Sequence, residues 1–282
     1  MASSLALSKR TGQVIDALVV VGLPLLGLLA PDHRATWYLA LAAGFAGVVT
    51  AVAGGAAVVT WWGEKQVVRL QGVRRGSARL GEGLWDTSLA MWVAACLLAW
   101  PLWRAWTGRP IGLVWSLDEA GGWIAIPQTL LGILVLDAWL YWKHRILHSR
   151  LLFVFHRGHH MYRDPNALSG FSVGPVEALL TFWPLLLVAH PKATHWAPLY
   201  FAMVGGFIAL NYYLHCGVRI ELLERLLAPV RLNSSVFHNR HHANAEVNFG
   251  EAFTLWDRLC KTREEDIRAE RDASDSDASP LP

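Results

Sequence analysis

Charged side chains are scarce in this chain of 282 residues. Asp, Glu, Lys and Arg together make up 17% of it, whereas 54% of the residues are hydrophobic and the mean hydropathy is +0.30. Soluble domains carry about 25% charged residues. The composition therefore excludes an ordinary soluble globular protein and indicates a membrane protein.

Cysteines are few, and the common cofactor motifs are missing. Cys96, Cys216 and Cys260 are far apart and form no Cys-x-x-Cys pair, which excludes a disulfide framework and a thiolate metal site. The sequence has no Gly-x-Gly-x-x-Gly loop after a strand, no haem-attachment motif and no cysteine cluster for an iron–sulfur group. If the chain carries out a redox reaction, its electrons come from a separate protein.

Long apolar runs are abundant. A helix needs about 20 apolar residues to cross a hydrocarbon core roughly 30 Å thick. We expect spans near residues 13–31, 36–62, 87–103 and 121–142, followed by two further apolar runs at 175–189 and 196–214. The first of these two runs is short and flanked by proline, so the pair forms either a full hairpin or a re-entrant one. The prediction is an all-α integral membrane protein, a bundle of about four to six transmembrane helices.

Basic residues predict the orientation of this bundle, because cytoplasmic loops are enriched in Lys and Arg. Three basic clusters lie before the first run, after the second and after the fourth: Lys9 and Arg10; Lys65, Arg69, Arg74, Arg75 and Arg79; Lys143, Arg145 and Arg150. All three are therefore expected on the cytoplasmic face of a multi-pass protein. The first run could instead be a cleaved signal peptide, although Asp16 and Pro24 interrupt its apolar core.

Histidines gather near the predicted cytoplasmic ends of the spans. Nine of the twelve form four groups: His144 and His148; His156, His159 and His160; His215; and His238, His241 and His242. Residues three and four apart lie on one face of a helix, so the members of a group can reach one ion. A lone His-x-x-x-His is usually surface or capping chemistry, but two His-x-x-His-His groups indicate a metal site.

The number of histidines also bears on the number of ions. A catalytic zinc ion takes about three protein ligands, so nine histidines suit two ions. Ligation by histidine alone fits iron, zinc or copper, and the spacing does not select among them. Asp137 and Asn211 are candidates for a supporting catalytic role, since each lies on the helical face of nearby histidines. His33, His190 and His195 are expected across the membrane from the cluster and are not counted as ligands.

Residues 125–262 resemble the family of sterol desaturases and fatty acid hydroxylases. The resemblance rests on three stretches: Asp137-x3-Tyr141-Trp142-x-His144-Arg145-x2-His148; Phe155-His156-x2-His159-His160; and Phe237-His238-Asn-Arg-His241-His242 with Asn248-Phe249-Gly250 and Leu255-Trp256-Asp257-Arg258-Leu259. It implies two iron ions (Fe2+/Fe3+) on the nine histidines, O2 as co-substrate and a cytoplasmic histidine cap on a helical membrane bundle. One departure is Phe171-Ser-Val-Gly-Pro175-Val-Glu177, which keeps Pro and Glu but lacks the Arg and His that family members often carry.

The expected organisation has three parts. Residues 1–120 hold N-terminal spans and a basic linker, 121–262 form the catalytic domain, and 263–282 form a disordered acidic tail. The expected reaction is hydroxylation of a lipid C–H bond, with desaturation as the alternative. A membrane zinc hydrolase is less favoured because no His-Glu-x-x-His motif is present, and a metal transporter or sensor would place its ligands inside the membrane.

The expected partners are a lipid from the bilayer and a separate electron-transfer protein, with no nucleic acid. Exposed basic residues could dock an acidic electron donor or could instead meet anionic headgroups. The residues considered for this surface are Arg145, Arg157, Arg163 and Arg240.

Overall fold

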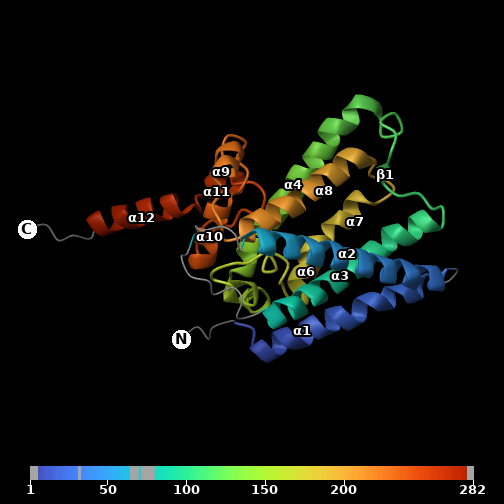
Figure 1. The fold of residues 1–282 in the computed structure, drawn as a ribbon, viewed down its shortest axis with the longest axis horizontal. Helices are drawn as coiled ribbons and strands as arrows, with labels where there is room; N and C mark the ends of the chain where they lie inside the picture. The colour runs from blue at the N-terminus through green and yellow to red at the C-terminus, as the bar shows by residue number, and fades with distance from the viewer. Residues whose placement is uncertain (1–5, 31–32, 64–69, 71–79, 278–282) are drawn as a thin grey trace, which may run out of the picture.

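The computed structural model describes residues 6–30, 33–63, 70 and 80–277, and over these residues the chain is mainly helical (Figure 1). Five helical segments are long and apolar enough to cross a membrane: Lys9–Leu29, Arg34–Trp62, Glu82–Trp106, Gly122–Leu147 and Ala197–His215. They correspond to five of the six apolar runs in the sequence. The predicted all-α membrane fold is therefore confirmed.

The first three long helices form one side of the bundle. They are α1 (Lys9–Gly22), continued by a 3-10 turn over Leu23–Leu29, α2 (Arg34–Gly63) and α3 (Leu80–Trp106). Alanines at the interface of α2 and α3, such as Ala40 and Ala95, are fully buried, because a small side chain lets two helix backbones approach closely. Large apolar side chains on the outer faces remain exposed, which suits helices surrounded by lipid.

The other side of the bundle is built by α4 (Ala125–Leu147) and α8 (Ala197–His215). Between them in the sequence lie two short apolar helices, α6 (Pro175–Phe182) and α7 (Pro184–Val188). The break between α6 and α7 falls at Pro184, which has no backbone N–H to continue the helical hydrogen bonds.

The α6–α7 segment connects the two ends of the bundle. Both α4 and α8 end at the histidine-rich end, so the chain between them must return to the opposite end. There, Gly112 N donates to Ala189 O at 2.9 Å, and His195 N donates to Gly112 O at 2.7 Å. These bonds lead into a short parallel pair of β1 (Leu113–Val114) and β2 (His195–Trp196). The chain over residues 175–214 therefore runs from the histidine-rich end to the opposite end and back, as in the full hairpin, although Pro175–Leu187 is shorter than the five candidate spans.

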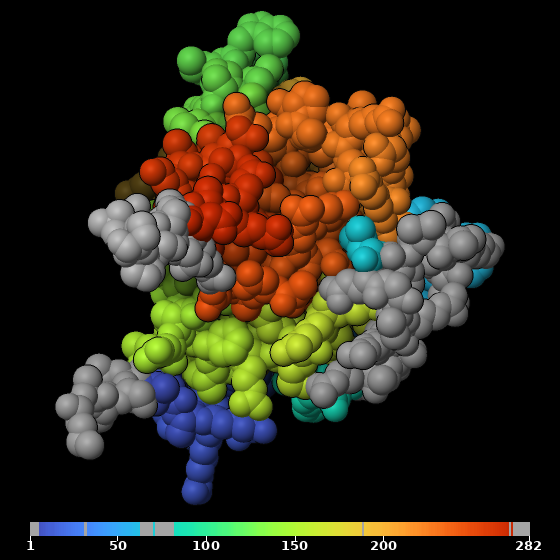
Figure 2. All heavy atoms as spheres, turned by 90° about the vertical axis from the view of Figure 1, so that its left-hand side faces the viewer, coloured from blue at the N-terminus to red at the C-terminus, as the bar shows by residue number. Residues whose placement is uncertain are grey.

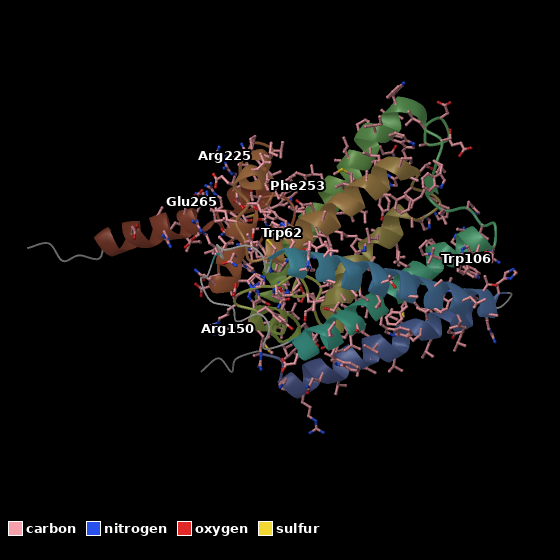
Figure 3. The ribbon with its side chains drawn as sticks, viewed as in Figure 1. Trp62, Trp106, Arg150, Arg225, Phe253 and Glu265 are labelled. Carbon is pink, nitrogen blue, oxygen red and sulfur yellow. The ribbon has the colours of Figure 1, made fainter. Side chains whose placement is uncertain are left out.

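Short helices cover the histidine-rich end, and we call residues 148–174 and 216–263 the cap. Its helices, with a 3-10 turn at His159–Met161, are α5 (Phe153–His156), α9 (Glu221–Leu227), α10 (Ser235–Ala243) and α11 (Leu255–Cys260). In Figure 2, which looks onto this end, the orange and red C-terminal segments lie beside the yellow-green segment that follows α4. Figure 3 shows Arg150, Arg225 and Glu265 at the cap end and Trp106 at the far end of the bundle.

A disordered tail was expected over residues 263–282, but residues 264–277 form the helix α12 (Glu264–Asp277). Its start is fixed by several contacts. Asn248 Oδ1 accepts from Glu264 N at 3.0 Å, Arg263 pairs with Asp266, and Arg268 pairs with Glu264 one turn earlier. Such i,i+4 pairs and acidic residues in the first turn stabilise a helix without any buried apolar face. The linker residues Lys65, Arg69, Arg74, Arg75 and Arg79 lie outside the described residues.

The path of α6 and α7 predicts that residues 150 and 192 lie on opposite sides of the membrane. Single cysteines at Arg150→Cys and Lys192→Cys, both exposed positions, are introduced into a Cys260→Ser background, where Cys96 and Cys216 are buried. A membrane-impermeant maleimide added to sealed vesicles should label one variant from outside and the other only after permeabilisation. Labelling of both from the same side would mean that residues 175–189 are re-entrant.

Candidate metal centre

The structure brings all nine histidines of the four sequence groups together at one end of the bundle. The side-chain nitrogens form two groups, within each of which the ligand atoms lie within 4.8 Å of one another. The five-histidine group contains His144, His148, His156, His160 and His241, and the four-histidine group contains His159, His215, His238 and His242. Histidines that are adjacent in the sequence therefore belong to different groups. His160 and His241 lie in the five-histidine group, and their neighbours His159 and His242 lie in the four-histidine group.

Each element places its histidines by simple helical geometry. His144 lies in the last turn of α4, and His148 follows at its C-cap, one turn further on. Ser234 caps the N-terminus of α10 by accepting from Phe237 N at 3.3 Å, which starts the helix one turn before His238. The i, i+3, i+4 spacing then directs His241 and His242 toward the two groups from one short helix.

Three rings of the five-histidine group are oriented by hydrogen bonds at Nδ1. His144 Nδ1 donates to Phe249 O at 2.8 Å, and His241 Nδ1 donates to Val247 O at 2.7 Å. His156 Nδ1 donates to the Glu177 carboxylate at 2.8 Å. Since a carbonyl oxygen can only accept, the neutral rings of His144 and His241 have their hydrogen on Nδ1 and a lone pair on Nε2.

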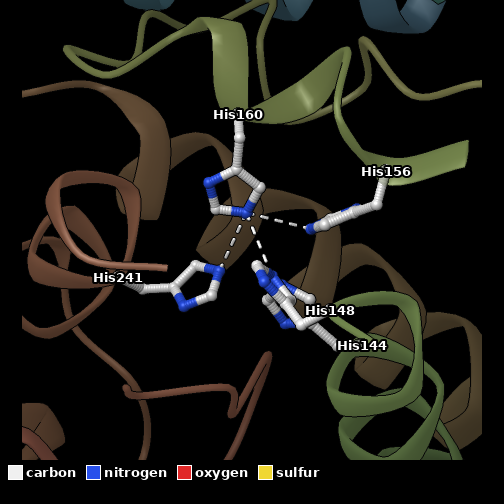
Figure 4. Close-up of side chains that lie close together, drawn as sticks. All are labelled: His144, His148, His156, His160 and His241. Carbon is white, nitrogen blue, oxygen red and sulfur yellow. Dashed lines mark hydrogen bonds between the residues drawn. The ribbon is translucent and has the colours of Figure 1, made fainter. Parts of the chain in front are cut away.

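These lone pairs converge on one point. His160 Nε2 lies 3.1 Å from the Nε2 atoms of His148, His156 and His241, as the dashed lines in Figure 4 show. A single N–H on His160 could satisfy only one of these contacts, and His144 Nε2 is buried with no hydrogen-bond partner among the described residues. A cation at the centre satisfies all of them together. Two imidazole nitrogens bound at right angles to an ion, each at about 2.1 Å, would lie about 3 Å apart, which fits these distances.

The four-histidine group has the same character. His215 Nδ1 donates to Asn211 O at 2.8 Å, which leaves a lone pair on its Nε2, 3.0 Å from His238 Nε2. Among the described residues, His242 has both ring nitrogens buried without a hydrogen-bond partner. Buried polar atoms are normally satisfied, so orphaned nitrogens in a cluster of imidazoles fit a second ion.

Burial keeps the cap histidines neutral and therefore able to bind a metal. Removal from water, reinforced by neighbouring imidazoles, lowers the pKa of His148 to about 2 and that of His160 to about 3. The same causes hold the pKa values of His156, His159, His238 and His242 well below 6.5. A protonated imidazole has no lone pair to offer, so this environment maintains the form that coordinates an ion.

The two supporting residues expected from the sequence have other contacts than predicted. The Asp137 carboxylate accepts from Ala252 N, Phe253 N and Trp256 Nε1, the last at 2.7 Å, and not from a histidine. The reason is that the polypeptide after α10 folds back onto α4 at this level. Asn211 is closer to its expected role, but it orients His215 through its backbone oxygen, while its side chain donates to Gly170 O at 3.0 Å.

Sequence reasoning missed several residues that hold the histidines. Glu177 was noted only as part of a departure from the family pattern, yet it is 2% exposed and accepts from His156. Asp257 is fully buried and accepts from the amides of Phe249 and Gly250, which fixes the carbonyl that His144 uses. No histidine lies near Glu177 or Asp257 in the sequence. Local sequence patterns therefore gave no sign that these carboxylates position the histidines.

Two positions near the histidines have no room for a side chain and are occupied by glycine. A Cβ on Gly250 would lie 2.6 Å from Asp257 Oδ2, and a Cβ on Gly170 would lie 2.8 Å from His215 Nδ1. Contacts below 3.0 Å require a neighbour to move. These positions therefore allow the chain to pass directly against the groups that orient the ligands.

The remaining histidines lie away from the two groups. His190 and His195 lie at the far end of the bundle, where His195 contacts Thr129 in α4 and His190 stacks on Trp100. His33 immediately precedes α2, whose other end approaches the cap. The structure therefore separates these three from the nine, as the sequence predicted.

Together, the fold and the buried histidines define an all-α integral membrane protein with two groups of side chains suited to metal ions. Residues 129–262 match the model of the fatty acid hydroxylase family. This match supports the resemblance of this part of the chain to the sterol desaturase and fatty acid hydroxylase family. The match begins in α4 and ends after α11, so it contains all nine histidines.

Several curated proteins are similar over the same region. Lathosterol oxidase of Rattus norvegicus is 29% identical over 148 residues, which cover 50% of this chain and 47% of that protein. The Delta(7)-sterol 5(6)-desaturase of Gibberella zeae is 30% identical over 148 residues, 50% of this chain and 39% of that protein. Methylsterol monooxygenase 1 of Danio rerio is 30% identical over 131 residues, 45% of this chain and 43% of that protein.

The matched region thus spans less than half the length of these relatives. No solved structure matches the chain.

Removing one ligand from either group should lower the metal content. His241→Ala and His242→Ala each delete an imidazole from a different group, and we expect each to lose at least about 0.5 ion per chain by elemental mass spectrometry. The matched control is His190→Ala, an exposed histidine at the other end of the bundle, which should keep the wild-type content. Equal loss in His190→Ala would contradict the assignment.

Asp137→Asn should destabilise the cap while leaving the ligands in place. The substitution weakens three hydrogen bonds to a carboxylate that is 3% exposed, and a charged hydrogen bond contributes about 2 kcal/mol. Thermal unfolding in detergent should shift to lower temperature by several degrees, whereas the exposed control Asp118→Asn should not change it. An unaltered melting temperature together with lost metal would instead support a direct role at the site.

Proposed function

We propose that this protein is a membrane di-iron oxygenase that uses O2 and externally supplied electrons to hydroxylate a C–H bond of a lipid. The observation that carries the proposal is the convergence of nine imidazoles, seven buried and two partly buried, in two groups within the matched segment. The names of its relatives describe an oxidase, a desaturase and a monooxygenase of sterols. A sterol, a fatty acyl chain or a related lipid is therefore the proposed substrate class.

In this proposal each of the two histidine groups holds one metal ion. The five-histidine group would hold one ion and the four-histidine group the other, with residues 121–262 as the catalytic domain. When bound, the two iron ions (Fe2+/Fe3+) would supply the binding and reductive activation of O2. The protein holds the rings in the neutral tautomer, keeps bulk water away by burial, and positions the lipid. Histidine ligation alone would also suit zinc, and the family resemblance is what favours iron.

A groove between α2 and α3 supports a lipid substrate. It has a volume of about 350 Å3 and is lined by Ala53, Ala56, Ala57, Thr60, Trp61, Leu84 and Leu168. Trp61 is 61% exposed and Leu84 52% exposed, so the groove opens on the outer surface of the bundle. Leu168, one of its lining residues, lies two residues before Gly170, where an added Cβ would lie 2.8 Å from His215 Nδ1. An apolar chain from the bilayer could reach the four-histidine group by this route.

Two features support the proposed surroundings of the site. The basic residues that begin the first span and end the fourth favour a cytoplasmic location for the cap. Arg150 and Arg157 are exposed there and offer positive charge to an acidic electron-transfer protein. The chain would then take its lipid from the membrane and its electrons from the aqueous side.

Desaturation is the second candidate reaction, because one relative is named as a desaturase. Both reactions begin by removing a hydrogen from an unactivated C–H bond. The arrangement of histidines serves either, and the position of the lipid relative to the two groups would decide the outcome.

The decisive experiment combines metal analysis with product analysis. The protein is purified in detergent after expression with 57Fe, and its iron content and Mössbauer spectrum are measured. It is then supplied with a reductase system, candidate sterols and acyl lipids, and 18O2. Two coupled irons per chain and an 18O-labelled lipid would support the hydroxylase, and an unlabelled product with a new double bond would support the desaturase. Stoichiometric zinc despite ample iron, with no lipid oxidised, would overturn the proposal.

Filling the groove should slow turnover without changing the metal content. Ala57→Trp places a large ring in the space beside Trp61, and we expect kcat/KM for the lipid to fall roughly tenfold through steric exclusion. Ala105→Trp, on α3 near the opposite end of the bundle, is a control for a bulky addition to an exposed helix surface. If Ala57→Trp retains full activity on long-chain lipids, the substrate does not use this groove.

A further inference from the structure

The two histidine groups differ in how their rings are held. In the five-histidine group, His156 Nδ1 faces both oxygens of the Glu177 carboxylate at 2.8 Å. In the four-histidine group, the oriented ring is that of His215, which donates to a neutral backbone carbonyl. Among the described residues, Nδ1 of His159, His238 and His242 has no hydrogen-bond partner. One group is thus supported by an acidic side chain and the other by weaker contacts.

Glu177 belongs to a buried charge network. Lys143 Nζ lies 2.7 Å from Glu251 Oε1, 3.9 Å from Glu177 Oε1, and donates to Thr181 Oγ1 at 3.0 Å. The Thr181 hydroxyl in turn donates to the backbone oxygen of Glu177 at 2.8 Å. The side chains of Lys143 and Glu177 are each 3% exposed. One ammonium therefore serves two carboxylates, and when both are ionised a net negative charge remains beside His156.

A cation at the five-histidine group would fix this charge state. An ion on His156 Nε2 occupies the lone pair there, so the ring must carry its proton on Nδ1. Glu177 is then an ionised acceptor, which increases the electron density on the ring and offsets the positive charge of the ion. The Coulomb attraction acts in a buried environment, where it is stronger than in water.

We propose that Glu177 is a positioning residue that makes the two metal sites unequal, with the five-histidine site binding its ion more tightly than the four-histidine site. The inference rests on the binuclear site of the proposed function. Removing a carboxylate that orients a ligating histidine lowers metal affinity by about 10- to 100-fold. The effect of Glu177 should be confined to the five-histidine site, because its contact to the ligands runs through His156.

The test measures the affinity of each site separately. His242→Ala disables the four-histidine site, and His241→Ala disables the five-histidine site, so each background retains one group largely intact. Fe(II) is then competed away with a chelator, with and without Glu177→Gln, which keeps the shape of the side chain and removes its charge. Fe(II) affinity should fall about 10- to 100-fold in the His242→Ala background and stay unchanged in the His241→Ala background.

A matched control uses the same substitution on another hydrogen-bonded carboxylate of the cap. Glu224 accepts from Tyr213 Oη at 2.6 Å and from Val236 N at 3.4 Å. Among the described residues it makes no hydrogen bond to the nine histidines, so Glu224→Gln should alter neither affinity. The iron retained in the His241→Ala background also reports that the Glu177→Gln protein is folded.

Two results would overturn the inference. An equal loss of affinity in both backgrounds would mean that Glu177 acts on the fold as a whole, and no loss in either would mean that the carboxylate does not tune the site. Failure of the proposed function looks different: the wild-type protein would then bind no iron pair or would oxidise no lipid. A wild type that holds two irons and oxidises lipid, with Glu177→Gln affinities unchanged, would contradict only the inference about Glu177.

Discussion

Nine imidazoles, seven buried and two partly buried, pack against one another with lone pairs facing inward, and the rest of the structure depends on the positive charge that this arrangement favours at its centre. The rings cannot supply all of one another's hydrogen bonds. Each neutral imidazole has one N–H, and His144, His156 and His241 use theirs at Nδ1 to bond groups outside the cluster. Protonation would create mutually repelling cations in an environment that already disfavours charge. The arrangement is therefore built for ions, and the folding of the cap follows from the need to bring α4, α8 and α10 to the same place.

Carboxylates perform much of the positioning, but seldom by direct contact with a ring. Asp137 holds the segment after α10 against α4, and Asp257 holds the amides of Phe249 and Gly250, so that Phe249 O faces His144. Glu177 alone of the three contacts a histidine. Asp137 and Asp257 each accept three hydrogen bonds from donors that would otherwise be buried without a partner.

In the proposed function, the membrane bundle gives the site two kinds of access. The cap carries exposed arginines, while the groove between α2 and α3 opens along the bundle surface. The α6–α7 segment makes this arrangement possible, since it returns the chain so that α8 can end beside α4. The proposed oxidation of a lipid with electrons from a soluble donor would use this combination of an apolar entrance and a polar face.

Sequence alone determined the class of protein, the helical spans and the nine candidate ligands, because hydropathy and helical spacing are local properties that survive without knowledge of the fold. The family resemblance over residues 125–262 rested on the three histidine-containing stretches of the sequence, and it agrees with the match at 129–262. Only the tertiary structure decided how the ligands divide, since His159 and His160 are neighbours in sequence but turn to different groups. It also decided the role of Asp137, the partnership of Glu177 with His156 and the helical form of residues 264–277. The division of the ligands and the contacts of Asp137 and Glu177 depend on segments distant along the chain. The helix at 264–277 combines local pairs, Arg263–Asp266 and Arg268–Glu264, with the contact of Asn248 to its first residue.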